Sequence, residues 1–323
     1  MPNRLTQIAA RQRAELIRED EQTLAQIART YAALYDGLQG DIDALTLAIQ
    51  QMENPTAAQV KQLPQYKRLM RNAEADLDRF TAYTESTMDG AALAGIGLGL
   101  AHSAQLVQSM SGARFTGLQP GVMRPLLAYL DRDGPLYKRL SLLTGATVDR
   151  VVQTIIDGVG SGFNPRRIAG QIQSAFGGGL TDALRNTRTV QLYSYRDSAR
   201  ANYMASDGIV TGWVWYAELD ADVCPVCAAQ HGTIHELDEK LDGHYNCRCA
   251  ALPYIEGVTN EIELGTDWFD NLPESQQAGL LGQTKYEAWK DGKFGLSDLV
   301  DHADNEVYGT MVRERSLAEL IGE

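Results

Sequence analysis

All four cysteines of this 323-residue chain fall within a single short stretch. They form two pairs, Cys224-Pro-Val-Cys227 and Cys247-Arg-Cys249, and His244 lies three residues before the second pair. An isolated thiol behaves as a small buried hydrophobic group and has no reason to gather with others. Thiols gather when they share a metal ion or form disulfides. The stretch around these cysteines is therefore the strongest indication of chemistry in the chain.

The donors in this stretch suit zinc, which binds four ligands in a tetrahedron. A Cys-x-x-Cys turn places its two sulfurs on one side, and the spacing from Cys227 to His244 is typical of a zinc-bound loop. Five donors compete for four places, so a site of four thiolates and a site of three thiolates with one imidazole both fit. We predict a structural Zn²⁺ bound by four of five residues: Cys224, Cys227, His244, Cys247 and Cys249. Disulfides formed after assembly into an oxidising particle, or unbridged thiols, are the alternatives.

A catalytic metal is a sharper alternative for the same stretch. His231 and His235 flank the loop and are the residues that would serve a hydrolytic metal. Zinc deaminases, however, have His-x-Glu before Pro-Cys-x-x-Cys, whereas here the Cys-x-x-Cys comes first. The sequence also lacks the His-Glu-x-x-His pattern of metalloproteases. Because a catalytic zinc keeps one position open for water and five close donors favour a filled site, we expect no catalytic residues.

The elements around the cysteines must position them. The stretch 209–216 is rich in β-branched and aromatic residues and predicts a strand just before the first cysteine pair. A long helix from about Thr181 to Ala205 precedes that strand. We therefore expect a strand and a Cys/His zinc module over residues 209–255, forming a small α+β module clipped by zinc.

The rest of the chain is predicted to be mainly α. Apolar residues spaced three and four apart, a break at Asn54-Pro55 and a capping box from Thr56 to Gln59 predict an antiparallel helical hairpin over residues 5–88. The seam of this hairpin is expected to pair internally, with pairing to another chain as the alternative. The predicted ranges are a helical hairpin or coiled-coil arm over 1–110, a helical body over 111–208, and an acidic C-terminal extension over 256–323.

Glycine and proline divide the helical body. Asn164-Pro165 predicts the start of a helix, with an N-cap residue followed by proline at the first helical position. Gly177-Gly178-Gly179 is expected to be a joint between two helices. Short helices are expected in the acidic extension over 274–281, 285–290, 296–300 and 316–321.

The longest apolar run, Ala91–Ala101, is too short to cross a bilayer, which takes about 20 residues. Its three glycines, Gly95, Gly97 and Gly99, would each weaken a helix by roughly 1 kcal/mol. We interpret the run as a closely packed or flexible joint and expect no membrane span. The start of the chain shows no apolar stretch after its first charge, so we also expect no signal peptide. Synthesis in a reducing cytosol then favours metal over disulfides for the cysteines.

The net charge of −13 is unevenly distributed. Residues 111–215 carry 12 basic and 7 acidic side chains, whereas residues 216–323 carry 7 basic and 22 acidic ones. A role with nucleic acid would therefore depend on a local set of arginines and not on the overall charge. Four arginines recur at helical intervals and are the candidate contacts for DNA or a partner: Arg185, Arg188, Arg196 and Arg200. The alternative is an exposed, solvated helix face.

In this order, the motifs resemble the phage head-morphogenesis family, the minor head proteins similar to the F protein of phage Mu. The resemblance covers roughly residues 145–255, and its most specific part runs from Cys-x-x-Cys through His-x-x-Cys-x-Cys. Tyr245 departs from the family, whose members usually have proline after the histidine. The stretches that carry the resemblance are Asn164–Ala169, Asn186–Thr189, Gly212–Tyr216, Asp222–Cys227, Gln230–Ile234 and His244–Cys249.

The resemblance implies a virion component present in few copies, made in the bacterial host cytoplasm and located in the head near the portal vertex. Such a protein would act structurally in head assembly or in DNA packaging or delivery, without being an enzyme. Its implied partners are the portal protein and the major capsid or scaffolding protein, with packaged DNA as a further candidate. The alternative functions are a DNA-contacting ejection or packaging factor and a metal-dependent hydrolase or nuclease.

Overall fold

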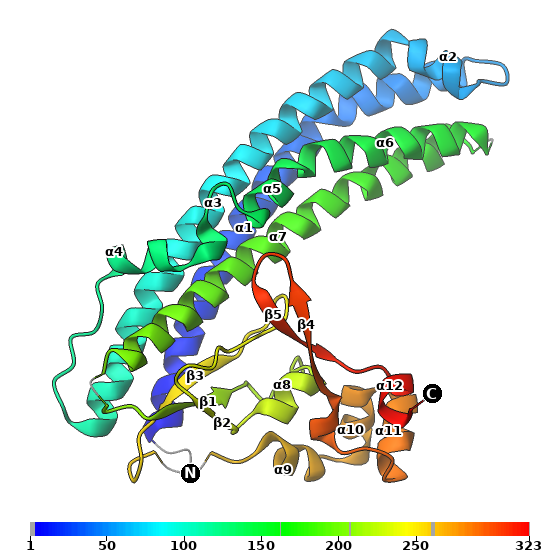
Figure 1. Cartoon of the computed structure of the whole chain (residues 1–323). Helices are drawn as coiled ribbons and strands as arrows, with labels where there is room; N and C mark the ends of the chain where they lie inside the picture. The colour runs from blue at the N-terminus through cyan, green and yellow to red at the C-terminus, as the bar shows by residue number, and fades with distance from the viewer. Residues whose placement is uncertain (1–3, 162, 207, 260–261, 323) are drawn as a thin grey trace. The chain divides into compact units, whose positions relative to one another are not determined.

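The computed structural model describes residues 4–161, 163–206, 208–259 and 262–322, and the protein is mainly helical with two small sheets (Figure 1). Residues 1–3, which begin the stretch used to judge a signal peptide, lie outside the described residues.

Contacts within the chain divide it into two units, which we describe separately. The sheet unit contains Met1–Arg18, Ala92–Leu130 and Thr189–Glu323, and the helical unit contains Glu19–Ala91 and Asp131–Arg188. Both units are assembled from segments that are distant in the sequence. The predicted domain ranges, each continuous in sequence, stay predictions.

Helices account for nearly all of the first two thirds of the chain. Two of the predicted starts have the expected hydrogen bonds. Thr56 and Gln59 form a reciprocal capping box, with the Thr56 N–H 3.0 Å from Gln59 Oε1 and the Gln59 N–H 3.3 Å from Thr56 Oγ1. Asn164 Oδ1 accepts from the Arg167 N–H at 2.9 Å. The helices are α1 (Arg4–Gln50), α2 (Ala57–Gln62), α3 (Pro64–Ser111), α4 (Pro120–Met123), η1 (Arg124–Leu126), η2 (Ala128–Leu130), α5 (Pro135–Ser141), α6 (Leu143–Gly160) and α7 (Pro165–Met204).

In the helical unit, α1 and α3 form an antiparallel hairpin. Tyr31 meets Phe80 edge to face, with ring centroids 4.7 Å apart. Further along α1, Asp41 accepts hydrogen bonds from Arg68 at 2.7 Å and from Asn72 at 2.6 Å. Residues nearer the end of α1 therefore contact residues nearer the start of α3, which is the pattern of an antiparallel pair and agrees with the predicted hairpin.

The predicted joint at Gly177–Gly179 is wrong, because α7 continues through it without a break. These glycines allow close packing within the helical unit. A Cβ on Gly178 would lie 2.7 Å from Nη1 of Arg150, and one on Gly179 would lie 2.8 Å from Oγ1 of Thr147. Tertiary packing against α6 thus outweighs the low intrinsic helix propensity of glycine.

The apolar run of Ala91–Ala101 lies inside the continuous helix α3, and its part in the sheet unit, from Ala92 onward, packs closely against α7. A Cβ on Gly95 would lie 2.3 Å from the Gln191 carbonyl oxygen, and one on Gly99 would lie 2.3 Å from the Tyr195 carbonyl oxygen. The expectation of close packing is therefore confirmed, and no joint interrupts the helix. Of the described helices, α3 alone is long and apolar enough to cross a membrane by length and composition, and 56% of that apolar window is buried inside the protein.

A three-stranded antiparallel sheet has the strand order β2-β1-β3 (Figure 1). Its residues share an apolar cluster with the cysteines. The predicted strand is β1 (Gly212–Tyr216), and it pairs with β2 (Ile234–Glu236) and β3 (Ala250–Tyr254). Its two tryptophans, Trp213 and Trp215, are buried in the same apolar cluster as Cys227. The cysteine loop begins after β1 and ends at β3, so the sheet fixes both ends of the loop.

The acidic extension consists of short helices and a β-hairpin. Helices occur where they were expected, and the structure adds α9 and the hairpin, which the sequence did not predict. Tyr308, at the hairpin turn, packs against Tyr193 in a tilted arrangement with ring centroids 4.5 Å apart, so the hairpin is held by an aromatic contact to α7. The elements after β1 and outside its sheet are α8 (Pro225–Gln230), α9 (Gly265–Asp270), α10 (Glu274–Leu281), α11 (Gln283–Lys290), η3 (Leu296–Leu299), β4 (Val300–Asn305), β5 (Gly309–Glu314) and α12 (Leu317–Ile321).

Candidate metal centre

The first cysteine pair lies at the start of helix α8. Cys224 is the N-cap residue, with extended backbone, and its sulfur accepts from the Cys227 N–H at 3.4 Å. Pro225 follows at the first helical position, where its fixed φ suits a helix start. The tight turn into α8 thus brings the two sulfurs to one side, as expected from Cys-x-x-Cys.

The second group of donors lies on a turn just before β3. The Cys247 N–H donates to the His244 carbonyl at 3.1 Å, which closes a turn over the intervening residues. Asn246 occupies the left-handed region of that turn, with φ of 61°, a conformation that asparagine tolerates better than most residues. Its N–H donates to Oγ1 of Thr189 on α7 at 3.3 Å. A turn tied to α7 therefore presents His244 and both of the later cysteines to α8.

The structure brings all five predicted donors together. Nε2 of His244 lies 3.1 Å from the Cys224 sulfur and 3.2 Å from the Cys227 sulfur, and the Cys227 and Cys247 sulfurs are 3.7 Å apart. A tetrahedral site with Zn–S bonds of about 2.3 Å places its sulfurs about 3.8 Å apart, so the separation of the Cys227 and Cys247 sulfurs fits a shared metal ion.

The donors form two groups, Cys224 with Cys227 and His244, and Cys227 with Cys247 and Cys249. Within each group all ligand atoms lie within 4.8 Å of one another, and Cys227 belongs to both. These groups could hold a metal ion, and Cys227 is the donor common to either choice of ligands.

Hydrogen bonding inside the cluster favours the thiolate form of some cysteines. Hydrogen bonding with Cys227 lowers the pKa of Cys224 to about 5, with His244 adding to the effect. Cys227 and Cys249 likewise lower the pKa of Cys247. The same sharing raises the pKa of Cys227, and burial raises that of Cys249. For His244, burial opposes the charged form, but the neighbouring cysteines outweigh it and raise its pKa to about 9. Thiolate is the form that binds metal, so the cluster is chemically suited to a cation.

Arg196, on α7, is buried behind the second cysteine pair. Arg196 is only 2% exposed. Its Nε–H donates to the Cys249 carbonyl at 2.7 Å, and an Nη2 N–H donates to the Cys247 carbonyl. Nη1 has no hydrogen-bond partner in the described part of the chain. A Cβ on Gly243 would lie 2.5 Å from this Nη1 and 3.1 Å from the Cys247 sulfur. Burial opposes the guanidinium charge, but the thiols of Cys247 and Cys249 outweigh it and raise the pKa of Arg196.

This placement corrects the prediction that Arg196 contacts DNA or a partner, because a buried guanidinium cannot reach a phosphate. The other three candidates have partners within the protein. Arg185 pairs with Asp182 at 2.9 Å and Arg188 with the buried Asp20 at 2.6 Å, both in the helical unit. Arg200, in the sheet unit, donates to the Leu237 carbonyl at 2.8 Å. Contact of these three with DNA or a partner stays a prediction.

The two histidines considered for a hydrolytic metal lie outside the donor groups found among the described residues. Nδ1 of His231 accepts from the Ala217 N–H at 3.0 Å, and burial lowers the pKa of His231 to about 4. His235 stacks on Trp213 with ring centroids 4.2 Å apart. His231 thus lies at the end of α8 and His235 lies within β2, so both have structural positions.

Arg13, on α1, is a site residue that the sequence did not reveal. Its Nε lies 2.6 Å from the Glu218 carboxylate, and an Nη1 N–H donates to the Arg248 carbonyl, in the residue between the second pair of cysteines. Arg248 in turn makes a bidentate pair with Asp220 at 2.7 and 2.9 Å. Because Arg13 and Arg248 are 235 positions apart, no local pattern could have linked them.

Comparison with known proteins supports the resemblance of these motifs to the phage Mu F family. The family model described as Phage Mu protein F like protein matches residues 149–252, a range that contains all five donors. This segment is phage Mu protein F-like. The match confirms the predicted family over these residues, about a third of the chain. No curated protein and no solved structure matches the chain.

Proposed function

We propose that this chain is a minor capsid protein of a tailed phage or prophage, which acts structurally at the portal vertex in head assembly or in DNA packaging or delivery. The family match supports membership of the head. The observation that carries the structural role is the convergence of five Cys/His donors from two turns, inside the matched segment.

In this proposal a structural Zn²⁺, bound by four of the five donors, joins the turn at α8 to the turn before β3. The loop between β1 and β3 contains only one short helix and one three-residue strand, and most of its buried apolar residues belong to a cluster that it shares with α7 and β1. A metal ion supplies stability that so small a core does not. The resulting rigid module would attach the protein to a portal or capsid protein.

The same geometry favours attachment over catalysis. Five donors lie close together in two groups that share Cys227, enough for the four protein ligands of a structural zinc, whereas a catalytic zinc takes three protein ligands and leaves a position for water. His231 accepts a hydrogen bond from Ala217 and His235 stacks on Trp213, so neither histidine supports the hydrolase hypothesis.

The test is metal content together with particle content. The recombinant full-length chain should contain about one zinc per chain by elemental analysis. Single Ser replacements of the four cysteines and His244→Ala should sort the donors, since four variants should lose zinc and one should keep it. An antibody against the chain should detect it in purified heads. A metal-free protein would refute the zinc, and its absence from heads would refute the assembly role.

A further inference from the structure

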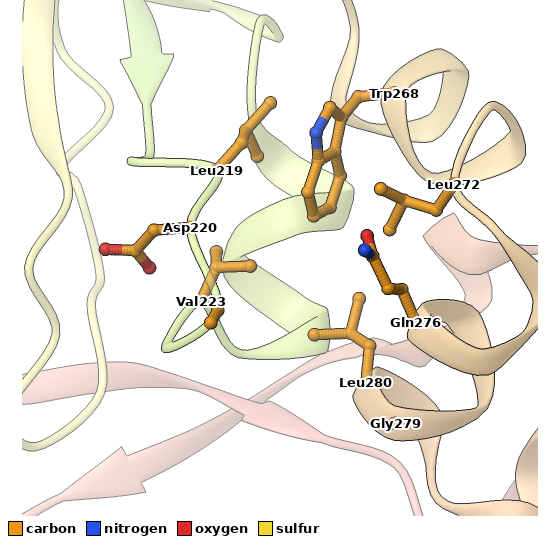
Figure 2. Close-up of a pocket in the computed structure, with 9 residues that line it drawn as sticks. Leu219, Asp220, Val223, Trp268, Leu272, Gln276, Gly279 and Leu280 are labelled. Atoms are coloured by element: carbon orange, nitrogen blue, oxygen red, sulfur yellow. The ribbon is translucent and has the colours of Figure 1, made fainter.

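A groove of about 610 Å³ lies in the sheet unit, between the approach to the first cysteine pair and helices α9 and α10. Figure 2 shows Leu219 and Val223 on one side and Trp268, Leu272, Gln276 and Leu280 on the other, with the Asp220 carboxylate directed away from the space between them. One wall is the stretch Leu219–Val223, just before Cys224, and the other comes from Gly265–Leu281. The apolar lining side chains are Leu219, Val223, Trp268, Leu272 and Leu280.

The two walls are fixed to each other, so the groove is already formed. The Gly265 N–H, at the start of α9, donates to the His231 carbonyl at 2.9 Å. A Cβ on Gly265 would lie 1.7 Å from the Ala228 carbonyl oxygen, which shows how closely α9 approaches α8. On the other wall, Arg248 holds Asp220 by its bidentate pair. A preformed groove loses little conformational freedom when a partner binds.

The lining is apolar and only partly covered by the protein. Trp268, Leu272 and Leu280 pack against the neighbouring apolar clusters but remain partly exposed. A partly exposed tryptophan flanked by leucines is the kind of surface that supplies much of the binding energy in protein interfaces. The volume is sufficient for one or two large apolar side chains.

Asp220 is the charged residue that lines the groove, and further carboxylates lie in the same two wall stretches. The two wall stretches, 219–223 and 265–281, contain no lysine or arginine and carry five carboxylates: Asp220, Asp222, Asp267, Asp270 and Glu274. Arg248 pairs with one of them and Lys290 with another, which leaves the wall acidic overall. Such a wall repels phosphate groups and attracts cationic side chains.

We propose that this groove binds a segment of another head protein that inserts one or two large apolar side chains and flanks them with lysine or arginine. The apolar lining provides affinity and the acidic walls select the flanking charge. That the partner is a head protein rests on the proposed function, whereas the chemistry of the segment rests on the groove alone.

Gly279 provides a variant that fills the groove without disturbing the fold. It lines the groove on α10, and a Cβ there would meet nothing within 4 Å. Gly279→Phe should therefore occupy the space while favouring the helix. Gly145→Phe is the matched control, because Gly145 is also an exposed helical glycine with nothing within 4 Å of a Cβ, and it lies in the helical unit.

The probes are two labelled 15-residue peptides that share one Leu/Phe ridge, one flanked by lysine and the other by glutamate. Fluorescence anisotropy with the full-length chain should show binding of the lysine peptide, at least tenfold weaker in Gly279→Phe and unchanged in Gly145→Phe. Its affinity should fall as salt rises. Equal binding of both peptides, no binding of either, or no effect of Gly279→Phe would overturn the proposal.

Two further measurements separate the occupants and the two proposals. Sedimentation that showed concentration-dependent dimers, lost in Gly279→Phe, would assign the groove to a second copy of this chain and overturn our choice. Binding of the lysine peptide by a chain that is absent from heads would refute the proposed function and leave the groove chemistry standing. A head-associated chain that binds neither peptide would refute the groove alone.

Discussion

Replacing Arg196 should damage the metal centre although this residue offers no ligand. The two carbonyls that it binds, those of Cys247 and Cys249, belong to residues that are almost fully buried. Arg196→Met would leave both carbonyls without these donors and would remove a positive charge beside the thiols. A hydrogen bond to a charged group is worth about 1.5–3 kcal/mol, and breaking a buried charged contact typically costs about 3–5 kcal/mol. We therefore expect Arg196→Met to lower the free energy of unfolding by about 3–5 kcal/mol.

The same change should weaken metal binding. The proposed Zn²⁺ with three or four thiolates would carry net negative charge, which the guanidinium of Arg196, next to Cys247, would offset. Loss of a residue that orients ligands from outside the coordination sphere commonly costs about 10–100-fold in metal affinity. Arg196→Lys should show a smaller loss, because lysine keeps the charge but lacks the planar fork that reaches two carbonyls at once.

The assay is urea unfolding together with zinc competition against a chromogenic chelator, on full-length protein. Arg200→Met is the control, since Arg200 lies one turn further along α7 and also donates to a main-chain carbonyl, but from a partly exposed position. The control should change the unfolding free energy by about 1 kcal/mol or less and should keep its zinc. If Arg196→Met unfolds at the same urea concentration as Arg200→Met and holds zinc as tightly as the unaltered chain, the reasoning is wrong.

Three other perturbations test separate parts of the sheet unit. Gly99→Ala should destabilise the protein by about 1–3 kcal/mol in urea unfolding, because the added Cβ would meet the α7 backbone. Gly97→Ala is the control and should stabilise the protein by up to about 1 kcal/mol, because a Cβ there has no atom within 4 Å. Equal effects of the two substitutions would contradict the close packing at Gly99. His231 has a pKa of about 4 when folded and about 6.5 when unfolded, so its contribution is present above pH 6.5 and is lost as pH falls toward 4. Unfolding measured at pH 7 and pH 5 should therefore show about 2 kcal/mol more loss in the unaltered chain than in His231→Gln, and parallel losses would count against this assignment. Removal of metal by a strong chelator should speed amide hydrogen exchange in residues 219–250 and leave exchange in the helical unit unchanged. An equal increase in exchange rate in both units would argue against local stabilisation by the metal.

Local patterns in the sequence were sufficient for most elements and for the types of ligand. The helix starts at Thr56 and Asn164 depend on side chains that cap their own turn, so a short window contains the whole cause. The five donors were identified because Cys-x-x-Cys and His-x-x-Cys-x-Cys are themselves local patterns. The joint expected at Gly177–Gly179 was wrong for the opposite reason, because its cause lies on α6, in side chains that a local window does not contain.

The contacts around the donors could not be predicted from short stretches of sequence, for the same physical reason. Arg196 had the spacing of a surface arginine, and only the tertiary fold turns it toward the carbonyls of the second cysteine pair. Arg13 reaches the same turn from α1, far away in the sequence. A short loop with little core of its own is thus positioned by two long helices and a sheet before any ion is considered. In this arrangement a metal ion would join turns that the helices and the sheet already hold close, and through Cys224 it would add to the restraint on the groove wall Leu219–Val223.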